Sequence, residues 1–163
     1  ISLKNDPYVK NKIKIENILK KECKDYLIIR LPQIVGKNKN VNTLTNSIYD
    51  CFLNDKTFKL WKNSKRNLID IDDINYILEK YFKNFEENKK IINIFNYKPV
   101  DVLRLLKVFS NLFDKKINIK IVKKNNRNIN LSKIQKDTLL PKFYYKNLKK
   151  RNYVLNMIAK YYL

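Results

Sequence analysis

The sequence predicts an α/β fold. Short apolar runs rich in isoleucine, leucine and valine alternate along the chain with longer segments whose apolar residues recur every three or four positions. The first pattern is typical of buried strands and the second of helices that cover a sheet. Because strands and helices alternate instead of being grouped, we expect a sheet with helices packed against it.

The first elements follow from local signals. A helix is predicted over residues 7–24, because Asp6 is suited to cap it and Pro7 to the first helical position. A β-branched apolar run over 26–31 then predicts a buried strand, which Pro32 ends.

The rest of the chain continues the alternation. Asp72 is expected to cap the helix that follows it. The predicted elements are a polar loop at 36–40, helices at 44–53, 73–85, 99–113 and 147–162, and strands at 58–61, 67–71, 91–94 and 117–122.

Length and composition limit the possible classes. The 163 residues suffice for one domain or a piece of a larger one, and 44% hydrophobic residues argue against disorder. No apolar run reaches the roughly 18 residues of a membrane span, and no signal peptide opens the chain. We therefore expect no membrane partner.

Rare residue types exclude several kinds of site. Without His, the chain cannot form a Ser-His triad or a His-ligated zinc site. Cys23 and Cys51 fit no metal spacing, so no metal site is predicted and a reducing cytoplasm is favoured. A single Gly excludes a Gly-rich phosphate loop, which needs several glycines in one turn.

The chain carries a formal net charge of +21. Such a surplus attracts polyanions, but the lysines are dispersed and the chain is also crowded with Asn, Ile and Tyr. We therefore favour compositional drift as the cause. The alternative is a basic nucleic-acid-binding module that uses the dense cluster at 142–151.

Tyr8 and Lys12 lie four residues apart on the first predicted helix and so share a face. An ammonium beside a phenol favours the phenolate, and such a pair can exchange a proton with an alcohol whose carbon exchanges hydride with a nicotinamide. By itself the spacing is more typical of a solvated helix surface than of a catalytic pair, because it recurs. The other pairs are Tyr76/Lys80 and Tyr145/Lys149.

Four segments stand in a recognisable order. They are Pro-Tyr-x-x-x-Lys at 7–12, Arg-Leu-Pro-Gln-Ile-Val-Gly at 30–36, Arg-Asn-Leu-Ile-Asp-Ile-Asp-Asp-Ile at 66–74, and Ile-Asn-Ile followed by Pro-Val-Asp-Val-Leu at 92–103. This series resembles the C-terminal half of the extended short-chain dehydrogenases/reductases, the family of NAD-dependent sugar-nucleotide epimerases and dehydratases. The resemblance covers residues 6–122 and fades beyond them.

The resemblance implies the C-terminal portion of a Rossmann-type fold with its small substrate-binding part. Residues 1–36 would end the Rossmann-like part and carry the Tyr-x-x-x-Lys helix, and residues 37–163 would be mainly substrate-binding. The N-terminal dinucleotide-binding half is absent, and Ser2 lies too close to Tyr8 to match the family's catalytic Ser or Thr. NAD or NADP would therefore bind only with the missing half, and we expect no catalysis by the chain alone.

The same resemblance assigns site residues. Tyr8 matches the catalytic acid/base, and Lys12 matches the lysine that tunes it and binds the nicotinamide ribose. Pro32 lies in the segment that passes the nicotinamide. Gln33 stands where many members have an Asn that contacts the sugar nucleotide, and Arg66 matches an arginine that holds the diphosphate.

Four further residues are interpreted as structural. Asp72 and Asp73 match the family's acidic pair and are expected to cap the helix that follows. Phe58 and Trp61 are expected in the core rather than as a platform on which a base stacks.

The resemblance implies part of an NAD(P)-dependent epimerase, dehydratase or reductase that acts on a nucleoside-diphosphate sugar, and surface polysaccharide synthesis is the role that we expect for it. The sequence leaves the reaction, the sugar and a homodimer open. A non-catalytic remnant that pairs with another Rossmann-containing chain is a further alternative.

Overall fold

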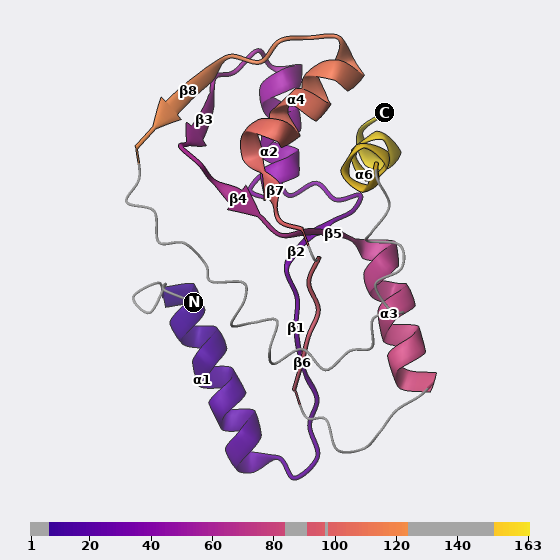
Figure 1. Ribbon diagram of the computed structural model, residues 1–163. Coiled ribbons are helices and arrows are strands. Elements are labelled where there is room, and N and C mark those ends of the chain that lie inside the picture. Colours follow the sequence, from indigo (N-terminus) through magenta and orange to yellow (C-terminus); the bar gives the residue numbers. More distant parts are fainter. Residues whose placement is uncertain (1–6, 84–90, 97, 124–151) are drawn as a thin grey trace.

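The computed structural model describes residues 7–83, 91–96, 98–123 and 152–163 (Figure 1). Strands and helices alternate along the chain, so the predicted α/β class is confirmed. The elements are α1 (Pro7–Glu22), β1 (Ile28–Arg30), β2 (Gln33–Val35), α2 (Leu44–Leu53), β3 (Phe58–Trp61), β4 (Lys65–Arg66), β5 (Leu68–Asp70), α3 (Ile71–Lys83), β6 (Ile91–Asn93), β7 (Val100–Asp101), α4 (Val102–Phe113), β8 (Ile119–Val122) and α6 (Tyr153–Tyr162).

Within the described residues the strands pair two by two. Three pairs are parallel, β1 with β6, β2 with β5 and β3 with β8, and the pair of β4 with β7 is antiparallel. In each parallel pair, at least one helix lies between the two strands in the sequence. A parallel crossover needs such a long connection. In the β2–β5 pair, Gln33 lies opposite Leu68 and Val35 opposite Asp70.

Two predicted strands are each accompanied by a neighbouring strand that was not predicted. β1 ends at Arg30, and after Pro32 the chain continues as β2, which pairs with a different strand. Proline has no N–H to give to a strand ladder, so the ladder changes partner there. The strand predicted at 67–71 is likewise preceded by the separate strand β4, and the sequence patterns did not predict β2, β4 or β7.

Two helices begin at other residues than predicted. α3 begins at Ile71, and the side chain of Asp70 accepts a hydrogen bond of 2.9 Å from the N–H of Asp72. The prediction that Asp72 caps this helix is therefore wrong, because Asp70 caps it and Asp72 lies in its first turn. α4 begins at Val102 instead of near residue 99, and the Asp101 side chain accepts from the N–H of Leu103 at 2.8 Å.

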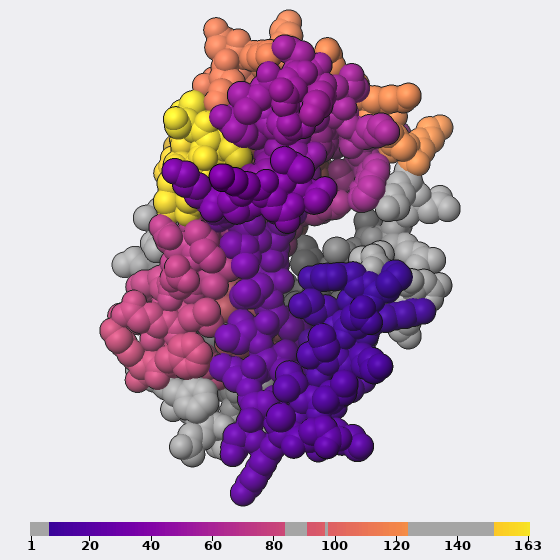
Figure 2. Space-filling model, turned by 180° about the vertical axis from the view of Figure 1, so that it is seen from behind, coloured from indigo at the N-terminus to yellow at the C-terminus, as the bar shows by residue number. Residues whose placement is uncertain are grey.

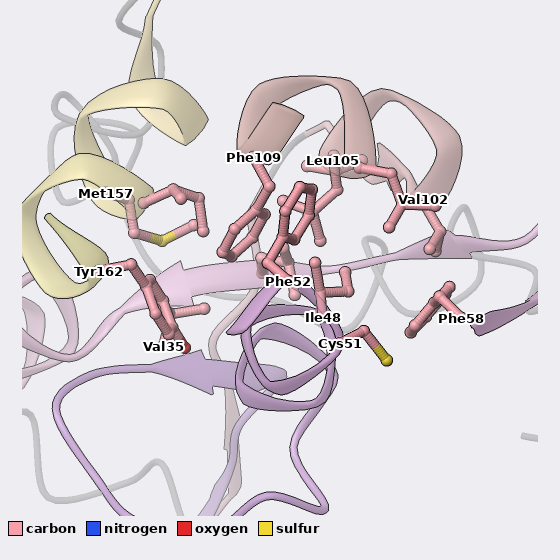
Figure 3. Close-up of a cluster of buried hydrophobic side chains, with 14 of the residues drawn as sticks. Val35, Ile48, Cys51, Phe52, Phe58, Val102, Leu105, Phe109, Met157 and Tyr162 are labelled. Carbon is pink, nitrogen blue, oxygen red and sulfur yellow. The ribbon is translucent and has the colours of Figure 1, made fainter. Parts of the chain in front are cut away.

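The main apolar core lies between α2, α4 and α6 (Figure 3). The rings of Phe52 and Phe109 stack with centroids 5.8 Å apart, and the ring of Tyr162 meets Phe109 edge-on at 5.2 Å. A second cluster lies beneath α3 and includes Ile69, Ile92 and Ile94. The helices thus bury their apolar faces on the paired strands.

Polar contacts fix α6 to the end of β5. The buried carboxylate of Asp70 accepts from the hydroxyl of Tyr161 at 2.6 Å and from Nζ of Lys160 at 3.1 Å, and the N–H of Asp70 donates to the hydroxyl oxygen of Tyr153 at 2.7 Å. Burial raises the pKa of Tyr153. Burial also disfavours the charge of Lys160, but its hydrogen bonds to Asp72, Tyr161 and Asp70 outweigh this effect and raise its pKa.

Helix α1 lies at the surface and has no buried residue (Figure 2). Arg30 of β1 holds it through a hydrogen bond of 2.9 Å from Nε to the carboxylate of Glu16, with a second from the guanidinium to the other oxygen. Its isoleucines Ile13, Ile15 and Ile18 are 45%, 52% and 49% exposed. None of the helices in the described part of the chain is both long enough and apolar enough to cross a membrane.

Candidate functional site

A hollow of about 400 Å³ opens where β2, β3, β4 and the start of α2 meet. Its volume lies within the range of small-molecule sites. The residues that line it are Gln33, Asn42, Leu44, Ser47, Phe58, Lys59, Leu60, Trp61, Ser64, Arg66 and Val102.

Gln33 and Arg66, both predicted as substrate-binding residues, line this hollow together. Strand pairing brings them there. The N–H of Gln33 donates to the backbone oxygen of Asn67 at 3.1 Å, at the start of the β2–β5 ladder. The residue that follows Arg66 is thus tied to Gln33.

The lining of the hollow combines apolar side chains with polar and positively charged ones. Lys59 and Arg66 are cations, Gln33, Asn42 and Ser47 offer hydrogen-bonding groups, and none of the described lining residues is acidic. Burial lowers the pKa of Arg66, but a guanidinium stays charged at neutral pH. A planar guanidinium fork among neutral donors is suited to bind a phosphate or diphosphate.

Trp61 does not lie in the core, contrary to expectation. It is 39% exposed and lines the hollow, and the guanidinium carbon of Arg66 lies 5.5 Å from the centre of its ring. Phe58, by contrast, is buried as predicted. The alternation along β3 could have predicted this exposure. Trp61 stands two residues after the exposed Lys59, so the two side chains lie on the same face of the strand.

Tyr8 and Lys12 do not line the hollow, and neither does Pro32. Tyr8 lies in the first turn of α1 and is 69% exposed, and Nζ of Lys12 lies 5.5 Å from the centre of its ring. In Figure 1 this end of α1 points toward the region of β3 and β4, and the other end leads into β1.

The Tyr8–Lys12 geometry is not special to this helix. Nζ of Lys80 lies 5.6 Å from the ring centre of Tyr76 on α3, in nearly the same arrangement. The third pair of this spacing, at 145/149, lies outside the described residues. Local geometry therefore does not single out Tyr8 as a proton-transfer group.

The residues that the structure describes do not form a cradle for a dinucleotide pyrophosphate. Gly36 is the sole glycine, and a Cβ atom placed on it would lie 2.9 Å from Cγ2 of Ile71. Its small size is therefore used for packing between β2 and α3. No group of three or more His, Cys, Asp or Glu side chains that could hold a metal ion occurs in the part of the chain that the structure describes.

Comparison with known proteins finds similarity of structure only. No protein-family model matches the sequence, and no curated protein matches it significantly. Among solved structures, the dTDP-glucose 4,6-dehydratase of Bacillus anthracis in complex with NAD is similar with a TM-score of 0.66 and 16% identity, covering 96% of this chain and 51% of that one.

Two epimerases show the same similarity. The UDP-glucuronic acid 4-epimerase of Bacillus cereus, in complex with UDP-glucuronic acid and NAD, gives a TM-score of 0.59 at 14% identity and covers 89% of this chain and 48% of that one. The UDP-N-acetylglucosamine 4-epimerase of Methanobrevibacter ruminantium gives 0.56 at 16% identity, covering 91% and 50%. This chain thus spans about half the length of these enzymes.

At these identities the comparison establishes the fold. The chain folds like part of the NAD-dependent sugar-nucleotide epimerases and dehydratases, so the resemblance recognised in the sequence is confirmed at the level of fold. The basic cluster at 142–151 lies outside the described residues, and the nucleic-acid-binding alternative stays a prediction.

Proposed function

We propose that this chain is the C-terminal part of an NAD(P)-dependent enzyme that epimerises, dehydrates or reduces a nucleoside-diphosphate sugar. The observation that carries the proposal is the convergence of Gln33 and Arg66 on one cationic hollow. The structurally similar enzymes with bound UDP-glucuronic acid and NAD support it.

In this proposal the hollow holds the nucleotide end of the substrate. Arg66 pairs with the diphosphate, and Lys59 adds positive charge on the same side. Gln33 hydrogen-bonds the sugar nucleotide, and the exposed face of Trp61 stacks on the base. The guanidinium carbon of Arg66 lies 5.5 Å from the centre of the Trp61 ring. The ring therefore lies next to the place that the diphosphate would occupy.

Tyr8 is the proposed acid/base. Its phenolate takes the proton of a sugar hydroxyl, and the ammonium of Lys12 stabilises that phenolate and binds the nicotinamide ribose. A nicotinamide dinucleotide bound past Pro32 would accept the hydride from the same sugar carbon. Return of the hydride to the opposite face of that carbon, together with the proton from Tyr8, would complete an epimerisation, and a reduction would supply hydride and proton to a keto sugar in the same way.

The dinucleotide requires a further part of the enzyme, because this chain lacks the glycine-rich cradle. We accordingly propose that the chain alone is inactive. The exposed isoleucines of α1 are suited to pack on that dinucleotide-binding half or on a second copy in a homodimer. A cytoplasmic role in polysaccharide synthesis is part of the proposal.

Trp61 provides the test, because it is the sole tryptophan. Titration of the chain with UDP-glucose is expected to change tryptophan emission, and Arg66→Ala should weaken binding about tenfold or more, since charged hydrogen bonds contribute about 1.5–3 kcal/mol. Isothermal titration calorimetry would give the same constants.

The matched control is Lys65→Ala, which removes a neighbouring cation that does not line the hollow. It should leave the affinity nearly unchanged. Equal losses from both variants would mean that only overall charge attracts the nucleotide. Binding that RNA displaces and that falls steeply with salt would favour the nucleic-acid alternative instead.

A further inference from the structure

A chain of hydrogen bonds connects the C-terminal helix to the rim of the hollow. It begins at Tyr162, whose hydroxyl donates to Oδ1 of Asn46 in α2. The amide nitrogen of Asn46 donates in turn to the backbone oxygens of Asn38 and Asn40, at 3.1 and 2.8 Å, and lies 2.9 Å from Oδ1 of Asn38. Asn46 is only 8% exposed, so both ends of its amide are committed within the protein.

The loop that Asn46 holds is built from side-chain turns. The N–H of Asn40 donates to Oδ1 of Asn38, and the N–H of Asn42 donates to Oδ1 of Asn40, both at 3.0 Å. Such turns are local and exposed, so they need support from the body of the protein to adopt one position. Asn42 is the last of the series, and it lines the hollow next to Leu44 of α2.

Tyr162 decides how the Asn46 amide is oriented. Its O–H donates to the amide oxygen, which leaves the amide N–H groups facing the loop. Figure 3 shows Tyr162 extending from α6 toward α2, and its ring packs against Tyr49 and Phe109 with centroids 5.1 and 5.2 Å away. The ring therefore belongs to the core, whereas the hydroxyl donates to Asn46 and is also hydrogen-bonded to the side chain of Thr45.

We propose that Asn46 and Tyr162 are positioning residues, which hold the loop at residues 38–42 so that Asn42 stays at the rim of the hollow. The link to ligand binding rests on the proposed function, whereas the link to loop order does not. The C-terminal helix would then contribute to substrate binding without touching the substrate.

Tyr162→Phe tests this, because it keeps the ring packing and removes only the hydroxyl. Loss of the hydroxyl's hydrogen bonds, to Asn46 and to the neighbouring Thr45, should speed amide hydrogen exchange at residues 40–43 roughly three- to tenfold and weaken the binding of UDP by a similar factor. Asn46→Asp should have at least this effect on the loop, since it keeps an acceptor for Tyr162 and removes the N–H groups that bind Asn38 and Asn40.

Tyr161→Phe is the matched control. It deletes a neighbouring hydroxyl of the same helix, whose partner is Asp70 instead of Asn46. It should leave loop exchange and UDP affinity unchanged. The proposal is overturned if Tyr162→Phe leaves loop exchange unchanged, or if Tyr161→Phe accelerates it equally. A wild-type chain that binds no UDP would refute the proposed function, and the exchange comparison would still decide the positioning role.

Discussion

Gly36 lies directly against Ile71. A Cβ atom on Gly36 would lie 2.9 Å from Cγ2 of Ile71 and 3.3 Å from its Cβ. The close approach joins the end of β2 to the first residue of α3. Gly36 does not have a positive φ, so the position needs glycine for space and not for backbone conformation.

We expect Gly36→Ala to lower the free energy of unfolding by about 1–3 kcal/mol, because the added methyl group overpacks this contact. Chemical denaturation would measure the loss. In an Ile71→Ala background the loss should be smaller, since the clashing Cγ2 is gone. An Ile71→Val background keeps Cγ2 and should give no relief, and equal losses in all three backgrounds would contradict this explanation.

The C-terminal end of α4 offers a stabilising change. Asp114 has φ 45° and ψ 40°, a left-handed conformation that glycine adopts more easily, and its negative charge lies at the unfavourable end of the helix dipole. Asp114→Gly should raise the free energy of unfolding by about 0.5–1 kcal/mol in urea. Asp114→Asn removes only the charge and should give a smaller gain, whereas a loss in both variants would mean that the carboxylate has a role of its own.

Acid should loosen the attachment of α1. Hydrogen bonds from Arg30 hold the pKa of Glu16 below its ordinary value. A lowered pKa in the folded state contributes stability above the ordinary carboxylate pKa of about 4.3, and this stability is lost as pH falls through the folded value. Urea unfolding at pH 3 to 6 should therefore depend less on pH in Glu16→Gln.

Glu22→Gln is the control for this experiment, because Glu22 is exposed and, within the described residues, forms its ion pair with the adjacent Lys21. It should leave the acid dependence as in the wild type. If both variants reduced the pH dependence of unfolding equally, overall charge and not the contact with Arg30 would be its cause.

Tyr8→Phe should separate chemistry from binding. In an enzyme completed by its dinucleotide-binding half, the variant should lose at least about a hundredfold in kcat and keep most of its affinity for the sugar nucleotide. Tyr76→Phe changes a tyrosine with the same lysine geometry and should keep full activity. Steady-state kinetics would show both, and a fully active Tyr8→Phe enzyme would remove the proposed role.

Trp61→Ala should weaken the binding of UDP more than the binding of inorganic pyrophosphate. Loss of the stacking face removes about 1–3 kcal/mol per base, whereas the diphosphate contacts of Arg66 remain. Calorimetry with both ligands would measure the difference, and Trp61→Phe should restore most of it. Equal losses for the two ligands would show that Trp61 acts through Arg66 rather than on a base.

Local patterns predicted most elements well. The helix at 44–53 and the strand at 58–61 occur with the predicted bounds, because their apolar periods and flanking polar residues are local signals. The errors lie at junctions. The strand β2 after Pro32 was not predicted, and Asp70 caps α3 although Asp72 was expected to cap it. The strand after Pro32 depends on pairing with the distant strand β5, and the choice of cap depends on the residue at which α3 begins. Neither can be recognised from a short stretch of sequence.

The candidate site was predictable to a smaller extent. Gln33 and Arg66 were recognised from motif order, and the structure places both in one hollow. Trp61 was expected in the core, although the alternation along β3 places it on the exposed face. Asn46 gave no signal, since a buried asparagine is recognised only from the loop and the helix that it connects.

The sequence by itself determined the α/β class, the order of the elements, the positive charge and the shared face of Tyr8 and Lys12, because each depends on composition or on spacing within one element. The tertiary structure alone decided which strands pair, how Gln33 and Arg66 come to line one hollow, and how Tyr162 reaches Asn46. These contacts join residues far apart in the chain. They form only when burial of the shared core compensates the entropy of bringing the segments together.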